Sequence, residues 1–336
     1  MITSRFKSHI TAVIHELEKR YDKLKVSTGP IHSYLGMVFD FTMKDYVAIN
    51  QIGMIEDVIS TTQTDVLEYI SGPLSSAHKE FAEKLKLIST SSPKTPAANY
   101  LYDLSPEAVL LHDTMKAIFH STVAKLLFIA NRSRQDILTA ISFLSGRVLY
   151  PTEEDWTKLT RVLLYLKATK TQTQGCTLPV QVHTFVDSSY NPLPSSKSRT
   201  GVCISLGRGV LYSKSTLQKI NTTSSCQAEL VALAEGLQQS IFLSYFLASQ
   251  AYPQLPVIVS QDNQSTIRLI ENGRPTSELT RHIEIRYFWA KDLVERQLIK
   301  VIYCPTTEMV ADYFTKPLQS TLFDLIRNKI MGKSSL

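Results

Sequence analysis

Acidic residues stand at four points where the sequence predicts that strands end or helices begin. Asp187 follows the apolar run TFV, Glu229 lies in the first turn of a predicted long helix, and Asp262 comes directly after the run PVIVS. Asp312, on a predicted short helix near the C-terminus, is a fourth candidate. Strand ends and helix N-termini converge at one edge of an α/β sheet, so we expect these carboxylates to meet there.

A cluster of carboxylates indicates a divalent metal site. Repulsion raises the pKa of one or more of the acids unless a cation neutralises them, and oxygen ligands suit Mg²⁺, for which Mn²⁺ can substitute. Two such ions about 3.5–4 Å apart would activate a water and stabilise the leaving oxygen in phosphodiester cleavage. Taken singly, each acid has a structural explanation, because Asp often forms turns and Glu early in a helix complements its dipole.

The C-terminal half carries the elements that would position these acids. Alternating apolar residues predict a three-strand meander, and a long helix beginning at Ser224 or Ser225 follows it. A buried strand, a second long helix and the strand IKVIY come next, and Pro305 ends that strand. This order predicts a mixed five-stranded sheet with helices on both faces.

The N-terminal half has a different pattern. We predict an amphipathic helix over 6–23, a hairpin over 34–49 that turns at Met43–Asp45, and a helix over 51–59. Residues 105–169 are predicted to be largely helical, with Pro106 at a first helical position. The polar segment TKTQTQG, 169–175, looks like an interdomain linker, so we place the main boundary there.

Composition bounds the class of protein without identifying it. The chain has 336 residues, 43% of them hydrophobic and 20% charged, which indicates about two globular domains and excludes collagen-like, coiled-coil and wholly disordered proteins. No apolar run approaches the roughly 18–20 residues of a membrane span, so we expect no membrane partner. The N-terminus lacks a signal-peptide core, which predicts an intracellular protein without distinguishing cytoplasm from nucleus. The four cysteines lie far apart without a Cys-x-x-Cys pair, so we do not expect a structural zinc.

Five segments together resemble a known domain: HTFVDSSY, SSCQAELVALAEG, SQDNQSTIRLIENG, TRHIEIRYFWAKDLVE and IYCPTTEMVADYFTKPL. In this order and spacing they resemble the ribonuclease H domain that ends the polyprotein of copia-type LTR retrotransposons. Upstream, YLGMVFDF resembles the end of that family's reverse transcriptase palm, and KLLFIANRSRQDILTAISFLSGRVLYPTEEDWTKLTRVLLYLKAT resembles the segment that joins the two enzymes. The resemblance implies a palm remnant at 1–60, a mainly helical thumb or connection region at 61–170 and a ribonuclease H-like α/β domain at 178–320.

The resemblance also implies roles for single residues. Asp187, Glu229, Asp262 and Asp312 would be the catalytic carboxylates that bind two Mg²⁺ ions, and His282 would act near the scissile phosphate or contact the backbone. The Glu lies between the first two Asp residues in sequence, which favours ribonuclease H over integrase, where the catalytic Glu comes last. A lone His at a helix start is more often structural.

Residues beside the acids could hold the substrate, an RNA–DNA hybrid. Residues 181–336 contain 16 Lys and Arg against 12 Asp and Glu, despite the acidic site. Basic residues of the meander could contact the phosphates of the hybrid, although ordinary solvated side chains are an equal alternative. The residues that we expect to bind nucleic acid are Lys197, Arg199, Arg208, Lys214, Lys219 and, near the RNA 2′-hydroxyls, Asn263.

Some features depart from the family pattern. Gln227 stands where an acidic residue is usual before Ala-Glu, Gln135 stands where Pro is common, and LYSKSTLQKI only loosely matches the aromatic and basic stretch that grips substrate. The chain has no Asp-Asp pair, the motif that holds the polymerase metals, and is expected to begin just beyond it. We therefore expect no polymerase activity from this chain alone, and the missing polymerase part or other retrotransposon polyprotein products are possible partners.

Two functions remain open from sequence. One is metal-dependent endonucleolytic hydrolysis of the RNA strand of RNA–DNA hybrids. The alternative is a non-catalytic nucleic-acid-binding or assembly fragment, a decayed or co-opted retrotransposon remnant. The four intact carboxylates favour the enzyme, whereas the missing polymerase motif favours a fragment.

Overall fold

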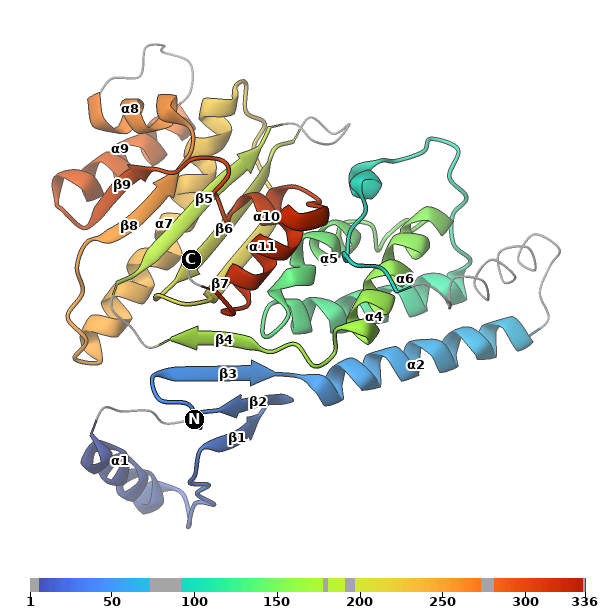
Figure 1. The fold of residues 1–336 in the computed structure, drawn as a ribbon, viewed down its shortest axis with the longest axis horizontal. Coiled ribbons are helices and arrows are strands. Elements are labelled where there is room, and N and C mark those ends of the chain that lie inside the picture. The colour runs from blue at the N-terminus through green and yellow to red at the C-terminus, as the bar shows by residue number, and fades with distance from the viewer. Residues whose placement is uncertain (1–5, 73–91, 178–180, 191–196, 273–280, 335) are drawn as a thin grey trace.

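A five-stranded mixed sheet organises the C-terminal part of the computed structural model, which describes residues 6–72, 92–177, 181–190, 197–272, 281–334 and 336 (Figure 1). The strand order is β7-β6-β5-β8-β9. The first three strands pair antiparallel, and β5, β8 and β9 run parallel, which confirms the predicted mixed sheet. The strands are β5 (His183–Ser189), β6 (Arg199–Ser205), β7 (Val210–Leu217), β8 (Val257–Gln261) and β9 (Ile299–Tyr303).

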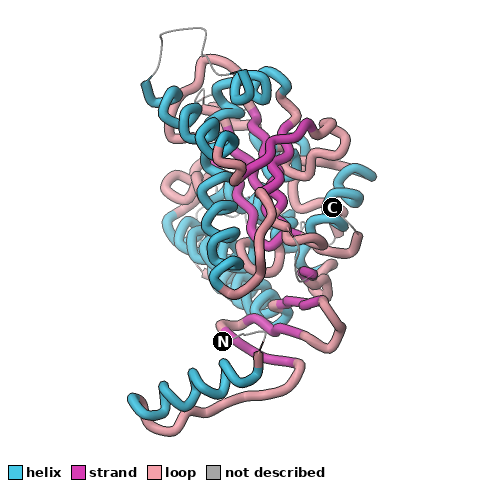
Figure 2. Tube along the Cα trace, turned by 90° about the vertical axis from the view of Figure 1, so that its left-hand side faces the viewer, coloured by secondary structure: helices cyan, strands magenta, loops and turns pink. Residues whose placement is uncertain are grey.

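Helices cover both faces of this sheet. The long helix α7 is capped by the side chain of Ser224, one of the two predicted caps, and runs along one face against β5 and β6 (Figure 2). The short helix α10 packs on the opposite face of β6 and β5. The helices of this part are α7 (Ser225–Ser249), α8 (Gln264–Asn272), α9 (Arg281–Glu295) and α10 (Asp312–Thr315).

Helix α7 is also long and apolar enough to cross a membrane by length and composition alone. Half of its most apolar window is buried inside the protein, however, and its residues Leu230, Leu233 and Leu237 belong to one core cluster with Val202 of β6 and Val257 of β8. Because these side chains already fill the core between helix and sheet, we interpret α7 as a core helix.

The N-terminal part contains a second, smaller sheet of four antiparallel strands in the order β1-β2-β3-β4. The predicted turn at Met43–Asp45 joins β2 to β3, and Asp45 adopts a left-handed conformation (φ 58°). Helix α1 precedes the sheet and buries none of its residues. The elements are α1 (Lys7–Arg20), β1 (Ile31–Tyr34), β2 (Met37–Asp40), β3 (Tyr46–Asn50), α2 (Ile52–Ser71) and β4 (Gln174–Thr177).

A helical region lies between α2 and β4 in sequence and against the larger sheet in space (Figure 1). The predicted helix at Pro106 is wrong: this stretch forms turns and a bridge between Leu110 and Thr152, and the first helix begins at Asp113. Thr152 begins the last helix of the region in a capping box with Asp155. The elements are η2 (Asn99–Tyr102), α4 (Asp113–Ala130), η3 (Gln135–Ile137), α5 (Leu138–Ser145), α6 (Glu153–Ala168) and, from the C-terminus, α11 (Ser320–Ile330).

The predicted interdomain linker is also wrong. Gln174 is buried, and its side-chain amide donates to the carbonyls of Val210 and Ile330, while β4 continues the small sheet beside β3. Buried apolar residues from the helical region, the larger sheet and the C-terminal helix form one cluster. The prediction fails because a buried glutamine and a solvated one look alike in sequence.

A buried ion pair lies within this shared core. Arg134 and Asp136 are both fully buried, and the guanidinium donates twice to the carboxylate, at 2.9 and 2.7 Å. Burial alone would raise the pKa of Asp136, but Arg134 and the hydroxyl of Tyr165 hold that pKa below its ordinary value. The Arg134 guanidinium also donates to the carbonyl and hydroxyl of Thr169, so the pair fixes the end of α6.

Removing one member of this pair should strongly destabilise the protein. Asp136→Asn leaves the Arg134 charge buried without a counter-ion, and we expect a loss of roughly 3–5 kcal/mol in the free energy of unfolding. Urea unfolding followed by circular dichroism measures the loss. The matched control is Glu56→Gln, which breaks the exposed 2.6 Å ion pair to Lys170 and should cost less than about 1 kcal/mol. Equal losses for the two variants would contradict the structural importance of the buried pair.

Candidate active site

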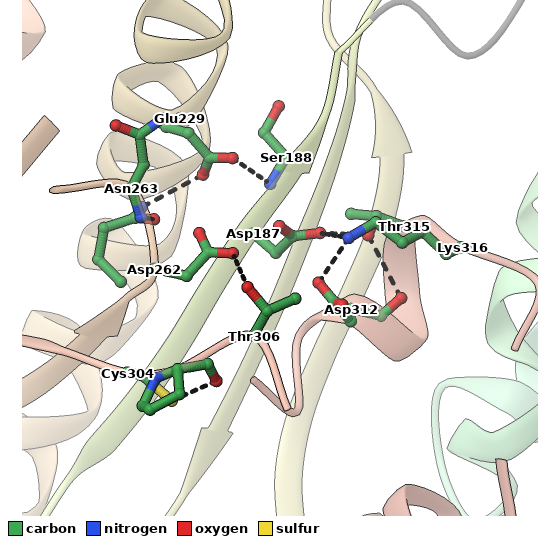
Figure 3. A network of polar contacts seen from close by, with 12 residues as sticks. Asp187, Ser188, Glu229, Asp262, Asn263, Cys304, Thr306, Asp312, Thr315 and Lys316 are labelled. Carbon is green, nitrogen blue, oxygen red and sulfur yellow. Dashed lines mark hydrogen bonds and ion pairs between the residues drawn. The ribbon is translucent and has the colours of Figure 1, made fainter. Parts of the chain in front are cut away.

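Three aspartates from separate elements meet at one edge of the larger sheet (Figure 3). Asp187 lies near the end of β5, Asp262 follows the last residue of the parallel neighbour β8, and Asp312 is the first residue of α10. One carboxylate oxygen from each lies within 4.8 Å of the others. The parallel pairing of β5 and β8 brings the first two together, since the carboxyl ends of parallel strands share an edge.

Glu229 reaches the same edge from α7 but lies beside the three aspartates. One of its carboxylate oxygens accepts from the backbone N–H of Ser188 (3.1 Å), and the other accepts from the side-chain amide of Gln261 (3.2 Å). Ser188 and Gln261 are the chain neighbours of Asp187 and Asp262. Glu229 is therefore fixed between the ends of β5 and β8, next to two of the three grouped carboxylates.

The electrostatics of the site oppose full ionisation. Burial raises the pKa of Asp187 and of Glu229, and neighbouring carboxylates raise both further. Burial and the charge of Asp187 also raise the pKa of Asp262. These shifts have the sign expected when like charges converge in a site that water reaches poorly.

Two residues that the sequence reasoning missed contact the aspartates. Thr315 donates a short hydrogen bond from its hydroxyl to Asp187, and the ammonium of Lys316 lies 2.8 Å from Asp312 and 3.9 Å from Asp187. Burial disfavours the Lys316 ammonium, but the surrounding carboxylates outweigh it and raise its pKa. The spacing is a usable signal for Thr315, because a residue three positions after Asp312 lies on the same face of a helix, whereas Lys316 follows the end of α10 in an extended conformation.

The donor set fits a hard divalent cation. Carboxylate oxygens on Asp187, Asp262 and Asp312 converge. Within the part of the chain that the structure describes, Lys316 supplies the only ammonium or guanidinium that forms an ion pair with them, and its side chain is 42% exposed. One positive charge does not balance this cluster. Mg²⁺ and Mn²⁺ prefer such all-oxygen ligands.

The residues expected to bind nucleic acid differ in their exposure and in the contacts that they make within the protein. Lys219 is exposed and Lys197 is partly exposed, whereas Lys214 donates to Glu235 at 2.8 Å. Asn263 accepts from the backbone N–H of Thr266, which caps α8. Arg208 donates to a backbone carbonyl near the C-terminus.

The expectation for Arg199 is corrected by the structure. Its side chain is 1% exposed, donates to the hydroxyls of Ser142 and Ser215, and lies 5.3 Å from the ring of Tyr102. Arg199 therefore joins the sheet to the helical region and does not face solvent where a phosphate could bind. His282 lies in the first turn of α9, but its side chain is outside the described residues.

Comparison of the sequence with known proteins identifies relatives along nearly the whole chain. It is 27% identical over 335 residues to the retrovirus-related Pol polyprotein from transposon TNT 1-94 of Nicotiana tabacum, covering 98% of this chain and 23% of that protein. It is 24% identical over 339 residues to the truncated transposon Ty1-A Gag-Pol polyprotein of Saccharomyces cerevisiae, covering 94% of this chain and 26% of that protein. The predicted resemblance to copia-type retrotransposon Pol polyproteins is confirmed, and the chain spans about a quarter of the length of these relatives. No protein-family model matches the sequence.

The comparison with solved structures finds matches with low sequence identity and TM-scores below 0.5. A foamy viral protease-reverse transcriptase in complex with double-stranded DNA is 13% identical, with a TM-score of 0.46, covering 91% of this chain and 44% of that chain. The N-terminal RNase H domain of Rv2228c from Mycobacterium tuberculosis is 16% identical, with a TM-score of 0.31, covering 44% of this chain and 96% of that chain.

Divalent cations should stabilise the protein in a pH-dependent way. The raised pKa values of Asp187 and Glu229 mean that ionising them costs stability as the pH rises above the ordinary carboxyl range. A cation binds the ionised forms, so Mg²⁺ should raise the melting temperature more at about pH 8 than at about pH 5.5. Differential scanning fluorimetry measures both shifts.

The same measurement on two variants locates the binding. Asp262→Asn should lose most of the Mg²⁺-dependent shift because it removes a ligand charge. Asp292→Asn, in an exposed pair with Arg296, should keep the shift of the wild type. A shift that is independent of pH, or one that survives in Asp262→Asn, would argue against the proposed ligands.

Proposed function

We propose that this chain is a ribonuclease H-type hydrolase that cuts the RNA strand of RNA–DNA hybrids endonucleolytically, as the ribonuclease H part of a copia-type retrotransposon. One observation carries the proposal: three carboxylates converge within 4.8 Å at the edge of a mixed sheet, in a chain homologous to retrotransposon Pol polyproteins. Homology along the chain supports the substrate class, and the carboxylates support the chemistry.

The carboxylates have distinct proposed roles. Asp187, Asp262 and Asp312 are the proposed metal ligands in the group, and Glu229, held by Ser188 and Gln261, is the fourth. Two Mg²⁺ ions, for which Mn²⁺ can substitute, would supply activation of a water and neutralisation of the leaving oxygen when bound. Thr315 orients the Asp187 carboxylate by donating to it.

Residues around the carboxylates form the proposed substrate contacts. Lys197, Lys214 and Lys219 would neutralise phosphates, and Asn263 lies directly after Asp262, where an RNA 2′-hydroxyl would pass. His282 remains a proposed participant near the scissile phosphate. Arg199 is withdrawn from this set because it is buried.

The proposed division of the chain needs two amendments. We retain a palm remnant, a helical thumb or connection region and a ribonuclease H-like domain at about 178–320. Residue 60 lies inside α2, however, so the first boundary belongs after Ser71, and the range 178–180 lies outside the described residues. Strand β4 belongs with the palm remnant by its pairing to β3. Template-directed DNA synthesis is not expected from this chain alone, and the missing polymerase part is a proposed partner.

Cleavage and binding should separate in variants. Asp262→Asn keeps side-chain volume but removes charge, so cleavage of a labelled hybrid should fall by orders of magnitude in Mg²⁺, while hybrid affinity stays similar or rises slightly as repulsion is relieved. Lys219→Ala combined with Lys214→Ala should instead weaken hybrid binding and reduce its salt slope by roughly one for each phosphate that is no longer neutralised. Gel-based cleavage and salt titrations of affinity measure these effects.

The controls decide between enzyme and binding protein. Lys300→Ala removes an exposed positive charge on β9 and should leave both properties near the wild type. A wild type that binds hybrid but does not cleave it in Mg²⁺ or Mn²⁺ would support the non-catalytic nucleic-acid-binding or assembly fragment. Cleavage by Asp262→Asn at the wild-type rate would refute the assignment of Asp262 as a catalytic metal ligand.

A further inference from the structure

The helix that carries Asp312 is too short to hold itself in place. Helix α10 contains one turn, Asp312–Thr315, and packs on β6 where Gly201 lies. A Cβ on Gly201 would lie 2.7 Å from the carbonyl oxygen of Ala311, so only glycine allows this close approach. A single turn bears the full cost of helix nucleation without the gain of propagation, so its position depends on external contacts.

Within the described residues, two of the three side chains from other elements that donate to backbone carbonyls of α10 belong to the helical region, while β5, β6 and β7 pack against the same turn. The carbonyl of Tyr313 accepts from the hydroxyl of Thr139 (2.5 Å), and the carbonyl of Thr315 accepts from the hydroxyl of Tyr102 (3.0 Å). Carbonyls in the last turn of a helix have no partner within it, so these donors replace the missing intrahelical bonds. From the larger sheet, Ser215 donates to the carbonyl of Phe314 (2.6 Å).

The side chain of Tyr313, the residue after Asp312, connects α10 to the buried Arg134–Asp136 ion pair. The Tyr313 hydroxyl donates to the backbone carbonyl of Asp136 (3.0 Å), whose carboxylate is held by Arg134 and Tyr165. The Tyr313 ring stacks on Phe323 of α11 with centroids 5.4 Å apart. Asp312 is thus the neighbour of a residue that the helical region and the C-terminal helix hold in place.

We infer that the helical region positions a metal ligand: Thr139, Tyr102 and the Asp136 backbone act through α10 to place Asp312 in the carboxylate group. Asp187, Glu229 and Asp262 are placed by β5, α7 and β8, whereas Asp312 lies on a single turn that packs on β6 and also receives hydrogen bonds from the helical region. The nuclease unit therefore includes the helical region. The inference rests on the proposed function only in taking Asp312 as a metal ligand.

Metal affinity tests the inference in the full chain. Thr139→Val keeps the shape of the side chain but leaves the Tyr313 carbonyl without its donor, so Mn²⁺ affinity should fall on the order of tenfold, the usual effect of removing a partner that orients a ligand. The Mn²⁺ affinity is measured by titrating the protein with Mn²⁺ and following the electron paramagnetic resonance signal of the free ion. This measurement needs neither an RNA–DNA hybrid nor catalytic turnover. Thr139→Ser retains the hydroxyl and should restore wild-type affinity.

The matched control lies in α2, which packs against α4 of the helical region. Thr62 and Thr122 share a buried hydrogen bond of 3.0 Å between α2 and α4, away from the carbonyls of α10. Thr62→Val should lower thermal stability to a similar extent while leaving Mn²⁺ affinity unchanged. Equal affinities for Thr139→Val and the wild type, or equal weakening in both valine variants, would overturn the positioning role.

Two further results separate the inference from the proposed function. If Thr139→Val does not fold, Tyr102→Phe removes only the donor to the Thr315 carbonyl and should weaken Mn²⁺ binding in the same direction; wild-type affinity in that variant would overturn the inference. A wild type that binds Mn²⁺ without cleaving hybrid defeats the proposed function alone, and the affinity comparison still decides the inference. A wild type that binds no Mn²⁺ defeats both.

Discussion

Repulsion among buried carboxylates is the constraint on which the arrangement of this protein depends. Asp187, Glu229 and Asp262 come to one edge of the sheet, and burial together with the charge of neighbouring carboxylates raises the pKa of each. Such a cluster opposes folding unless something holds it rigidly and a cation offsets it. The elements around the edge supply the rigidity: the parallel pair β5 and β8, the long helix α7, and the turn that carries Asp312.

The charge that offsets the cluster is incomplete within the described residues. Lys316 lies close to Asp312 and Asp187, and Thr315 and Gln261 donate hydrogen bonds to carboxylates of the site. The hydrogen bonds from Thr315 and Gln261 orient the carboxylates but do not neutralise their charge. Only the ammonium of Lys316 adds a positive charge. The cluster keeps an excess of negative charge, which fits the divalent-cation site that we propose better than a structural ion-pair network.

The fold outside the sheet is explained by the same need for rigidity. A one-turn helix cannot hold a charged ligand against repulsion, and α10 receives its donors from the helical region and β7. The buried Arg134–Asp136 pair in turn fixes that region where α10 attaches. Burying this ion pair costs desolvation, which the paired geometry and the hydrogen bonds to Tyr165 and Thr169 offset.

The sequence determined the local elements and the identity of the four acids. Period-two and helical patterns predicted the meander and α7, with Ser224 or Ser225 as its cap, because these depend on residues near in sequence. The tertiary structure alone decided which side chains are buried: Arg199 and Gln174 are polar residues that sequence reasoning put in solvent, and both lie in the shared core. It also decided how α10 is held, because Thr139 and Tyr102 donate to carbonyls of α10 that lie 174 and 213 positions further along the chain, and hydrogen bonds between such distant residues leave no periodic signal.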